Sequence, residues 1–274
     1  MVRRGRHLSI ALILLVVLAV SGGRVLADDA DRGKALFSDA WRLAEAGNHR
    51  AAVDKYQAGL VLMPDSSVAR YYLAKSLEAV DRDGEAILEY CRAARLAPAS
   101  EEGKQAIGYL RLPVDAGIAP GTTTFSDKSS YTGEMLNGKA HGCGTQSYVD
   151  GGRLRGVFRD GKIHGRGAIV YPRGTRYAGY WNDGDMTGRG VVVFNDGIIY
   201  AGDLRRGLEH GQGTRKWGDG SRYVGGWKSG RVDGYGEYFL ASENAWFKGQ
   251  WVNGCFRDVN GRPLAIGRPD SECQ

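Results

Sequence analysis

The sequence predicts an α+β protein made of two repeat domains, one helical and one built from β-hairpins. Two observations support this prediction. Pro64 and Pro98 lie 34 residues apart in a stretch that is otherwise free of proline. Further along the chain, Tyr177, Tyr200 and Tyr223 recur at a step of 23 residues. Self-similarity at a fixed period of roughly 20–50 residues indicates a repeat architecture.

Residues 1–27 have the pattern of an export signal. Three arginines fall within the first six residues, an apolar run covers residues 8–20, and small residues precede Asp28. A membrane-spanning helix needs about 20 apolar residues, so we expect cleavage near Asp28 and a periplasmic or secreted protein. An uncleaved membrane anchor is the alternative.

The charge of the chain argues against nucleic acid as a partner. The chain of 274 residues has 37 Lys+Arg and 31 Asp+Glu. Four of the basic residues and no acidic ones lie in residues 1–27. The remaining chain therefore has a net charge of only +2, from 33 basic and 31 acidic residues.

The region 28–110 resembles the tetratricopeptide (TPR) family over residues 33–66 and 67–100. Its repeat positions pair Ala52 with Ala86, Tyr56 with Tyr90, and Pro64 with Pro98. A helix cannot continue through proline, which lacks an N–H. We expect helices near residues 33–46, 49–62, 67–80 and 83–96, with a capping helix over 101–111. Arg70 and Gly59 depart from the family pattern.

The TPR resemblance implies a groove for a peptide or protein on the first helix of each repeat. The matching positions are Phe37, Trp41, Tyr71 and Lys75. The alternative is that Trp41 packs against a helix turn or a neighbouring domain.

A linker over residues 111–120 precedes the hairpin repeats. The copies share a consensus, Tyr-x-Gly-x-Trp followed by Gly-x-x-His-Gly-x-Gly, from which single positions depart. This consensus resembles the MORN (membrane occupation and recognition nexus) family. A half repeat over 121–130 is followed by repeats at 131–153, 154–176, 177–199, 200–222 and 223–246, a partial one at 247–254, and a tail over 255–274. We expect the tail to cover the last edge of the sheet.

The residue types of one repeat explain the expected hairpin. Residues i, i+2 and i+4 of a strand share a face, so Tyr177, Gly179 and Trp181 point the same way. Gly184 allows a tight turn, and the glycines at 188 and 190 leave space for neighbouring rings. An isolated hairpin is marginal in water, so we expect the hairpins to pair into one long sheet.

No motif predicts catalysis, a cofactor or a metal site, and we expect no enzyme. His141, His164 and His210 occupy one position of the repeat, where other copies have Thr187 and Asp233. Neighbouring copies lie about 10 Å apart, too far for the ligands of one zinc ion. A structural role is therefore favoured for these histidines.

Basic residues give the repeats a possible anionic partner. Residues 131–254 contain 17 Lys+Arg and 12 Asp+Glu. The MORN resemblance implies phospholipid binding or protein scaffolding. The candidate anion-binding residues are Arg155, Arg159, Lys162, Arg166, Arg205, Arg206 and Lys216. The alternative is that these are solvated strand edges and turns.

The four cysteines, at 91, 143, 255 and 273, are too few and too scattered to predict a disulfide framework. Cys255 and Cys273 could pair or stay free. The sequence thus predicts an exported, non-enzymatic scaffold or adaptor that binds proteins, with possible self-association. The rival hypothesis is a protein that binds anionic membrane surfaces.

Overall fold

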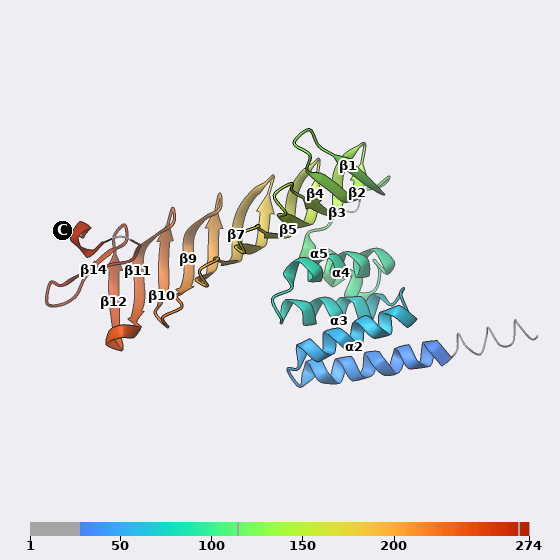
Figure 1. Ribbon diagram of the computed structural model, residues 1–274, viewed down its shortest axis with the longest axis horizontal. Coiled ribbons are helices and arrows are strands. Elements are labelled where there is room, and N and C mark those ends of the chain that lie inside the picture. The colour runs from blue at the N-terminus through green and yellow to red at the C-terminus, as the bar shows by residue number, and fades with distance from the viewer. Residues whose placement is uncertain (1–27, 114, 268, 274) are drawn as a thin grey trace, which may run out of the picture. The chain divides into compact units, whose positions relative to one another are not determined.

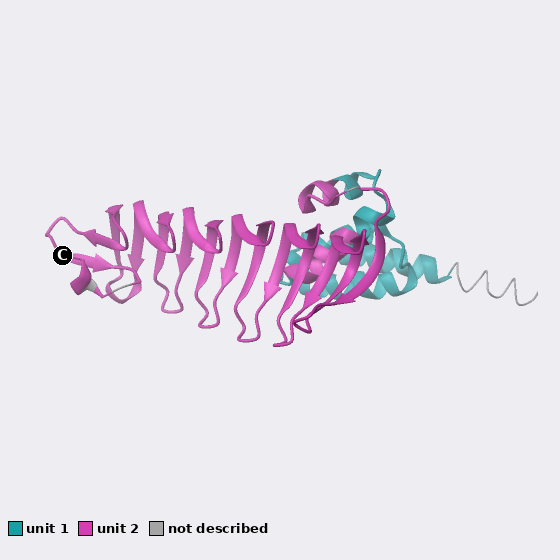
Figure 2. Ribbon diagram, turned by 90° about the horizontal axis from the view of Figure 1, so that it is seen from above, with its two compact units in different colours: residues 1–82, 92–104 teal, residues 83–91, 105–274 magenta. Residues whose placement is uncertain are grey.

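The computed structural model describes residues 28–113, 115–267 and 269–273. The expected export signal lies outside the described residues. The described chain divides into two compact units (Figure 2). The helical unit comprises residues up to 82 and 92–104, and the sheet unit comprises residues 83–91 and everything after 105.

Five helices precede the first strand of the described chain. They cover residues 28–45, α2 (His49–Leu62), α3 (Ser67–Glu78), α4 (Asp83–Leu96) and α5 (Glu101–Leu110) (Figure 1). The first helix thus begins by residue 28, earlier than expected, and α3 ends two residues before the expected end.

Local sequence signals explain where α2 and α3 begin. The Asn48 side chain accepts a hydrogen bond from the N–H of Ala51, and Ser66 does the same for Ala69. Such side chains satisfy N–H groups that have no partner in the first turn of a helix. Ala52 is fully buried and Tyr56 is 2% exposed.

Twelve antiparallel strands form one open sheet in which every strand pairs with its neighbours in sequence (Figure 1). The strands are β1 (Ala119–Thr124), β2 (Ser130–Leu136), β3 (Lys139–Ser147), β4 (Arg153–Arg159), β5 (Lys162–Val170), β6 (Arg176–Asn182), β7 (Asp185–Val193), β8 (Ile199–Arg205), β9 (Leu208–Lys216), β10 (Arg222–Lys228), β11 (Arg231–Leu240) and β12 (Ala245–Trp251). This architecture confirms the predicted α+β fold class and the hairpin sheet. β1 begins at Ala119, within the stretch that we expected to be a linker.

The hairpins within the repeats, from β2–β3 to β10–β11, close with a two-residue turn. In the turn between β6 and β7, Asp183 and Gly184 have φ angles of 49° and 100°. Two consecutive left-handed residues are typical of the type I′ turn, which matches the twist of antiparallel strands. Gly184 is therefore required by its backbone conformation, as the sequence predicted.

A row of glycines crosses the whole sheet, one on each strand. In register order the row is Gly121, Gly133, Gly144, Gly156, Gly167, Gly179, Gly190, Gly202, Gly213, Gly225, Gly236 and Gly249. A Cβ on Gly190 would lie 2.4 Å from the Tyr177 ring, so the row seats aromatic rings. Gly188 has a different role: its φ is +65° and no ring atom lies within 4 Å of a Cβ built there. Its expected role in leaving space for a ring was wrong.

The repeat tyrosines satisfy backbone groups at β-bulges. The register of β6 and β7 shifts between Gly179 and Trp181, where Tyr180 of β6 faces three residues of β7, 187–189, so the bulge lies on β7. A bulge leaves its extra residue outside the ladder of hydrogen bonds and bends the strand. The Tyr177 hydroxyl donates a hydrogen bond of 2.8 Å to the Tyr180 carbonyl. Tyr131, Tyr200 and Tyr223 make the same bond to the residue three positions later.

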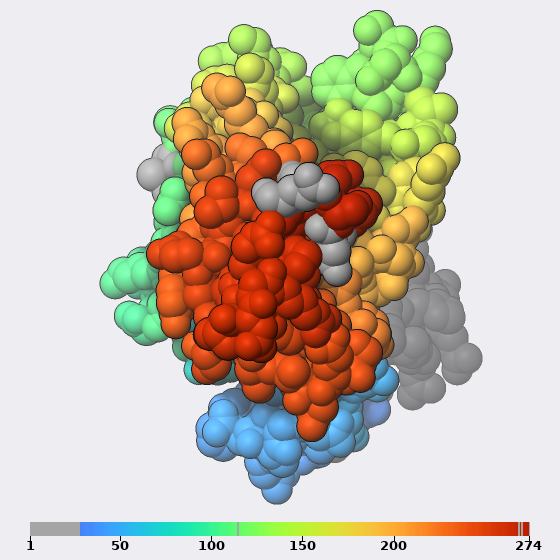
Figure 3. All heavy atoms as spheres, turned by 90° about the vertical axis from the view of Figure 1, so that its left-hand side faces the viewer, coloured from blue at the N-terminus to red at the C-terminus, as the bar shows by residue number. Residues whose placement is uncertain are grey.

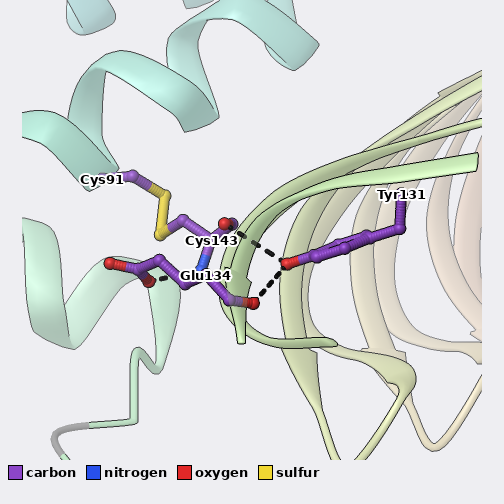
Figure 4. Close-up of a disulfide and its surroundings, with 4 residues drawn as sticks. All are labelled: Cys91, Tyr131, Glu134 and Cys143. Atoms are coloured by element: carbon purple, nitrogen blue, oxygen red, sulfur yellow. Dashed lines mark hydrogen bonds between the residues drawn. A yellow bond between two sulfur atoms is a disulfide. The ribbon is translucent and has the colours of Figure 1, made fainter. Parts of the chain in front are cut away.

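We call the face that carries these rings the inner face, and the opposite face the outer face. Figure 4 shows Tyr131 inside the bend of the sheet, with Cys143 on the other side. The inner rings pack edge to face: Tyr177 lies 5.3 Å from Trp181, and Tyr223 lies 5.5 Å from Trp251. The core of the sheet unit is thus a ladder of aromatic and apolar side chains along the inner face.

The C-terminal residues lie across the inner face of the last strands. A short hairpin of β13 (Cys255–Arg257) and β14 (Pro263–Ala265) forms a separate two-stranded sheet. Phe256 stacks on Trp251 with ring centroids 5.0 Å apart. Figure 3 looks at this end of the sheet and shows the C-terminal segment, in red, lying over the strands.

Candidate functional site

The helical unit contains an apolar pocket of about 290 Å³. It is lined by Phe37, Ser38, Trp41, Tyr56, Ser66, Val68, Ala69 and Tyr72. A Cβ on Gly59 would lie 2.4 Å from the Phe37 ring. The glycine that departs from the TPR pattern therefore makes room for a ring of the pocket.

Two of the four predicted groove residues line this pocket. Phe37 is half-buried, and Trp41 is 50% exposed. The pocket has Tyr72 where the repeat pattern predicted Tyr71. The Lys75 ammonium lies 5.7 Å from the Tyr72 ring, just outside the lining. Burial raises the pKa of Tyr71, whose ring lies edge-on to Tyr72.

The sheet unit carries a larger groove, of about 530 Å³, on the inner face between β3 and the turn after β8. Its apolar floor consists of Leu154, Ile163, Ile169, Trp181 and Met186. Ile163 and Met186 occupy the same position in two successive repeats. At this position the next two repeats have Glu209 and Val232. The floor therefore differs from one repeat to the next, unlike the glycine row.

Polar groups line the two sides of the groove. Lys162 and Arg206 lie on the side of the tight turns, and Tyr148 and Tyr171 on the side of the longer turns. Burial raises the pKa of both tyrosines, so both hydroxyls are protonated donors at neutral pH. The groove thus combines an apolar floor with hydrogen-bond donors, two cations and two carboxylates, those of Asp150 and Asp185.

A buried ion pair follows the groove on the inner face of β9. Arg215 bonds to the Glu209 carboxylate, and both side chains are less than one-fifth exposed. The Arg215 guanidinium also lies 5.0 Å from the Trp227 ring and 5.5 Å from the Phe194 ring. Removing one member of a buried pair leaves an unpaired charge, so these two residues depend on each other.

Two of the candidate anion-binding residues pack against helices of the sheet unit. The Arg166 guanidinium lies between the rings of Tyr109 and Tyr180, at 4.3 and 4.7 Å. A Cβ added to Gly84 of α4 would lie 3.3 Å from the Arg155 side chain, so this side chain packs close to the helix backbone. Both side chains are half-buried and hold residues of α4 and α5 on the outer face of the sheet.

The other candidate basic residues are exposed. Arg159 bonds to Asp183 at 3.2 Å, and this hydrogen bond lowers the pKa of the Asp183 carboxyl. The remaining members are Lys162, Arg205, Arg206 and Lys216, all with exposed side chains. The first three lie at the tight turns, whereas Lys216 lies at the opposite end of its strand.

Two histidines of the repeat, His141 and His164, bind turns of the next hairpin. His141 Nδ1 accepts a hydrogen bond of 3.4 Å from the N–H of Asp160, and His164 Nδ1 accepts one from Asp183. Asp233 takes the same role for Asn253 in a later repeat. No cluster of three or more metal-binding side chains occurs within the described parts of the chain.

Two disulfides are present, which corrects the expectation that the cysteines are too scattered. Cys255 pairs with Cys273, one of the two alternatives that the sequence left open. Cys91 of α4 pairs with Cys143 of β3 (Figure 4). The N–H of Cys143 also donates to the Glu134 carboxylate at 2.6 Å. Structural disulfides are typical of proteins that fold in an oxidising compartment.

Within the described part of the chain, no helix is both long and apolar enough to cross a membrane.

Comparison with known families identifies the hairpin repeats. The MORN repeat model matches residues 131–153, 155–176, 177–199, 200–222 and 223–244. A comparison with curated proteins found no match. Residues 131–244 are therefore an array of five MORN repeats, preceded by a helical region.

Proposed function

We propose that this protein is a non-enzymatic scaffold whose MORN array binds a segment of a partner protein in the inner-face groove. The observation that carries this proposal is the groove itself, with an apolar floor that includes Ile163, Trp181 and Met186. Pockets that bind ligands are usually apolar with a few polar groups that fix orientation. The varying floor residues supply the specificity, because the glycines and tyrosines are already used by the fold.

The groove favours a partner segment with apolar side chains and charged groups, because two cations and two carboxylates line it. The apolar side chains would replace water over Ile163 and Met186. An acidic group would lie near Lys162 and Arg206, which are on the same side of the groove. Such charges contribute to specificity and association rate more than to affinity.

The helical pocket is a second candidate binding surface. We propose that the helices are TPR-like and that Phe37, Trp41 and Tyr72 receive an apolar side chain of a peptide. A half-exposed tryptophan in an apolar pocket is a common anchor point of interfaces. With two surfaces, the protein would hold two partner segments at once.

We also propose that the protein is exported and acts in the periplasm or outside the cell. The two disulfides support this location. The arginines and the apolar run of residues 1–27 are the sequence pattern that would direct export.

Crosslinking in the native compartment, followed by mass spectrometry, tests the groove. Lys162 lies on the side of the groove, whereas Lys228 is exposed on β10 outside it. We expect crosslinks from Lys162 to a partner and far fewer from Lys228. Partner crosslinks that avoid Lys162 and form at Lys228 would contradict the groove.

Anionic membrane binding is the second candidate function. It is supported by Arg205 and Arg206 at a tight turn beside Leu208, whose side chain is 50% exposed. Basic residues next to exposed apolar ones are typical of proteins that bind membrane interfaces. Co-sedimentation with vesicles that contain phosphatidylserine should then fall in an Arg205→Glu, Arg206→Glu variant. This function would be excluded if the unmodified protein did not sediment with the vesicles at low salt, or if the variant sedimented with them equally well.

A further inference from the structure

The first strand of the sheet differs from all the others. Among the described strands, β1 pairs only with β2. It is the one strand of the twelve without a charged side chain, and the one without a buried residue. Charged side chains are a common device that prevents sheet edges from pairing. β1 lacks this device.

The outward backbone groups of β1 can be assigned from its turn. The N–H of Phe125 donates to the Ser129 carbonyl at 2.8 Å, so it points toward β2. Successive residues of a strand direct their backbone groups to opposite sides. The N–H groups of Thr122 and Thr124 therefore point to the open side, together with Pro120, which has no N–H. An edge proline on this side costs no hydrogen bond within the sheet.

The glycine row indicates what strand would fit the open side. Inside the sheet every glycine of the row faces a glycine on both neighbouring strands; Gly144, for example, faces Gly133 and Gly156. Gly121 faces Gly133 on one side only. A strand that continues the sheet in the same register therefore places a glycine opposite Gly121. The β1 strand of a second copy does this when the two strands run antiparallel with their Gly121 residues paired.

We propose that two copies of this chain pair through their β1 strands, with the two-fold axis at Gly121, to form one continuous sheet. In this register the N–H of Thr122 donates to the Pro120 carbonyl of the second copy. The N–H of Thr124 donates to the Ile118 carbonyl of the second copy. The symmetric bonds form in the other direction.

A contact between two identical β1 edges uses that edge in both copies and forms a closed dimer rather than a filament. At the other end of the sheet β12 also pairs with one strand only, but it carries Lys248, and Phe256 of the β13–β14 hairpin stacks on its Trp251. Pairing of two six-residue strands falls below the roughly 1,000 Å² of a stable interface. The dimer is therefore expected to depend on concentration.

Sedimentation of residues 28–274 over a range of concentrations tests this dimer. The measured mass should equal that of the monomer at low concentration and approach twice that value at high concentration. Replacing Thr122 and Thr124 together by Lys should abolish the rise, because four lysines meet at the axis. The control is Thr132→Lys on β2, since Thr132 faces Thr122 on the same exposed row. This control should keep the dimer.

Hydrogen exchange gives a second readout that does not depend on variants. The amides of Thr122 and Thr124 should become protected as the dimer forms. Those of Gly121 and Thr123, which point toward β2, should be protected at every concentration. A monomer mass up to the solubility limit would overturn the proposal, as would a dimer that persists in the paired lysine variant.

Discussion

Replacing Tyr177 by Phe removes one hydroxyl and tests why the repeat needs tyrosine. That hydroxyl donates to the carbonyl of Tyr180, which faces the bulge of β7, at 2.8 Å, and Tyr177 is 2% exposed. Without the hydroxyl, the half-buried carbonyl loses this partner, which costs about 1–3 kcal/mol when the group stays away from water. A cost of this size is large for a protein domain, whose total stability is roughly 5–15 kcal/mol.

The assay is urea unfolding, which gives the free energy of unfolding of the variant and of the unmodified protein. The m value should be the same for both proteins. The matched control is Tyr235→Phe, because Tyr235 is 60% exposed and its loss should cost less than about 0.5 kcal/mol. A further variant combines the changes at Tyr177 and Tyr223, which lie four strands or about 19 Å apart. Their costs should add within about 0.5 kcal/mol. If Tyr177→Phe is no less stable than the control, the hydroxyl does not support the bulge.

Three other expectations follow from the structure. Replacing Cys91 and Cys143 by Ala should cost about 4 kcal/mol, because the disulfide closes a loop of 52 residues; unchanged stability to urea would show that the pair does not form. Burial raises the pKa of Tyr223 from 10.0 to about 12, so its contribution to stability should be complete below pH 10 and lost between pH 10 and 12; a urea midpoint that stays constant over this range would disagree. Gly190→Ala should cost about 1–3 kcal/mol by overpacking, and less when Tyr177 is Leu, since a Cβ would contact that ring; equal costs in both backgrounds would exclude the steric explanation.

The elements of the sheet could be predicted because each repeat encodes its own hairpin. The tight turn at Gly184 and the inward position of Tyr177 both depend on residues within one period of 23. The bounds of α2 and α4 followed in the same way from the period of 34 and from Pro64 and Pro98, whereas the start of the first helix did not. These are local properties, so a single sequence contains the information.

Long-range contacts could not be predicted from the period. The Cys91–Cys143 disulfide requires that α4 lies against β3, and neither repeat contains information about the other. The same contact explains Arg166, which looks like a surface cation in its repeat but lies between Tyr109 and Tyr180. Sequence comparison of the copies did show that such residues vary, but not which of them another part of the chain covers.

The groove was only partly predictable. Lys162 and Arg206 were candidates because of their charge, and the structure places both on its side. The floor residues Ile163 and Met186 gave no signal, because an apolar residue on a strand is the usual core residue. Their role depends on the bend of the sheet, which results from the bulges.

The central claim is that the residues shared by all repeats build the sheet, whereas the varying residues of the inner face bind the partner. The most direct test is the affinity of the crosslinked partner for Met186→Arg and Val191→Arg, two variants of one strand. Met186 lines the groove, and Val191 is 42% exposed on the outer face. We predict that affinity falls at least tenfold in Met186→Arg, which corresponds to about 1.4 kcal/mol, and is unchanged in Val191→Arg. Equal affinities, in two variants that both fold, would contradict the claim.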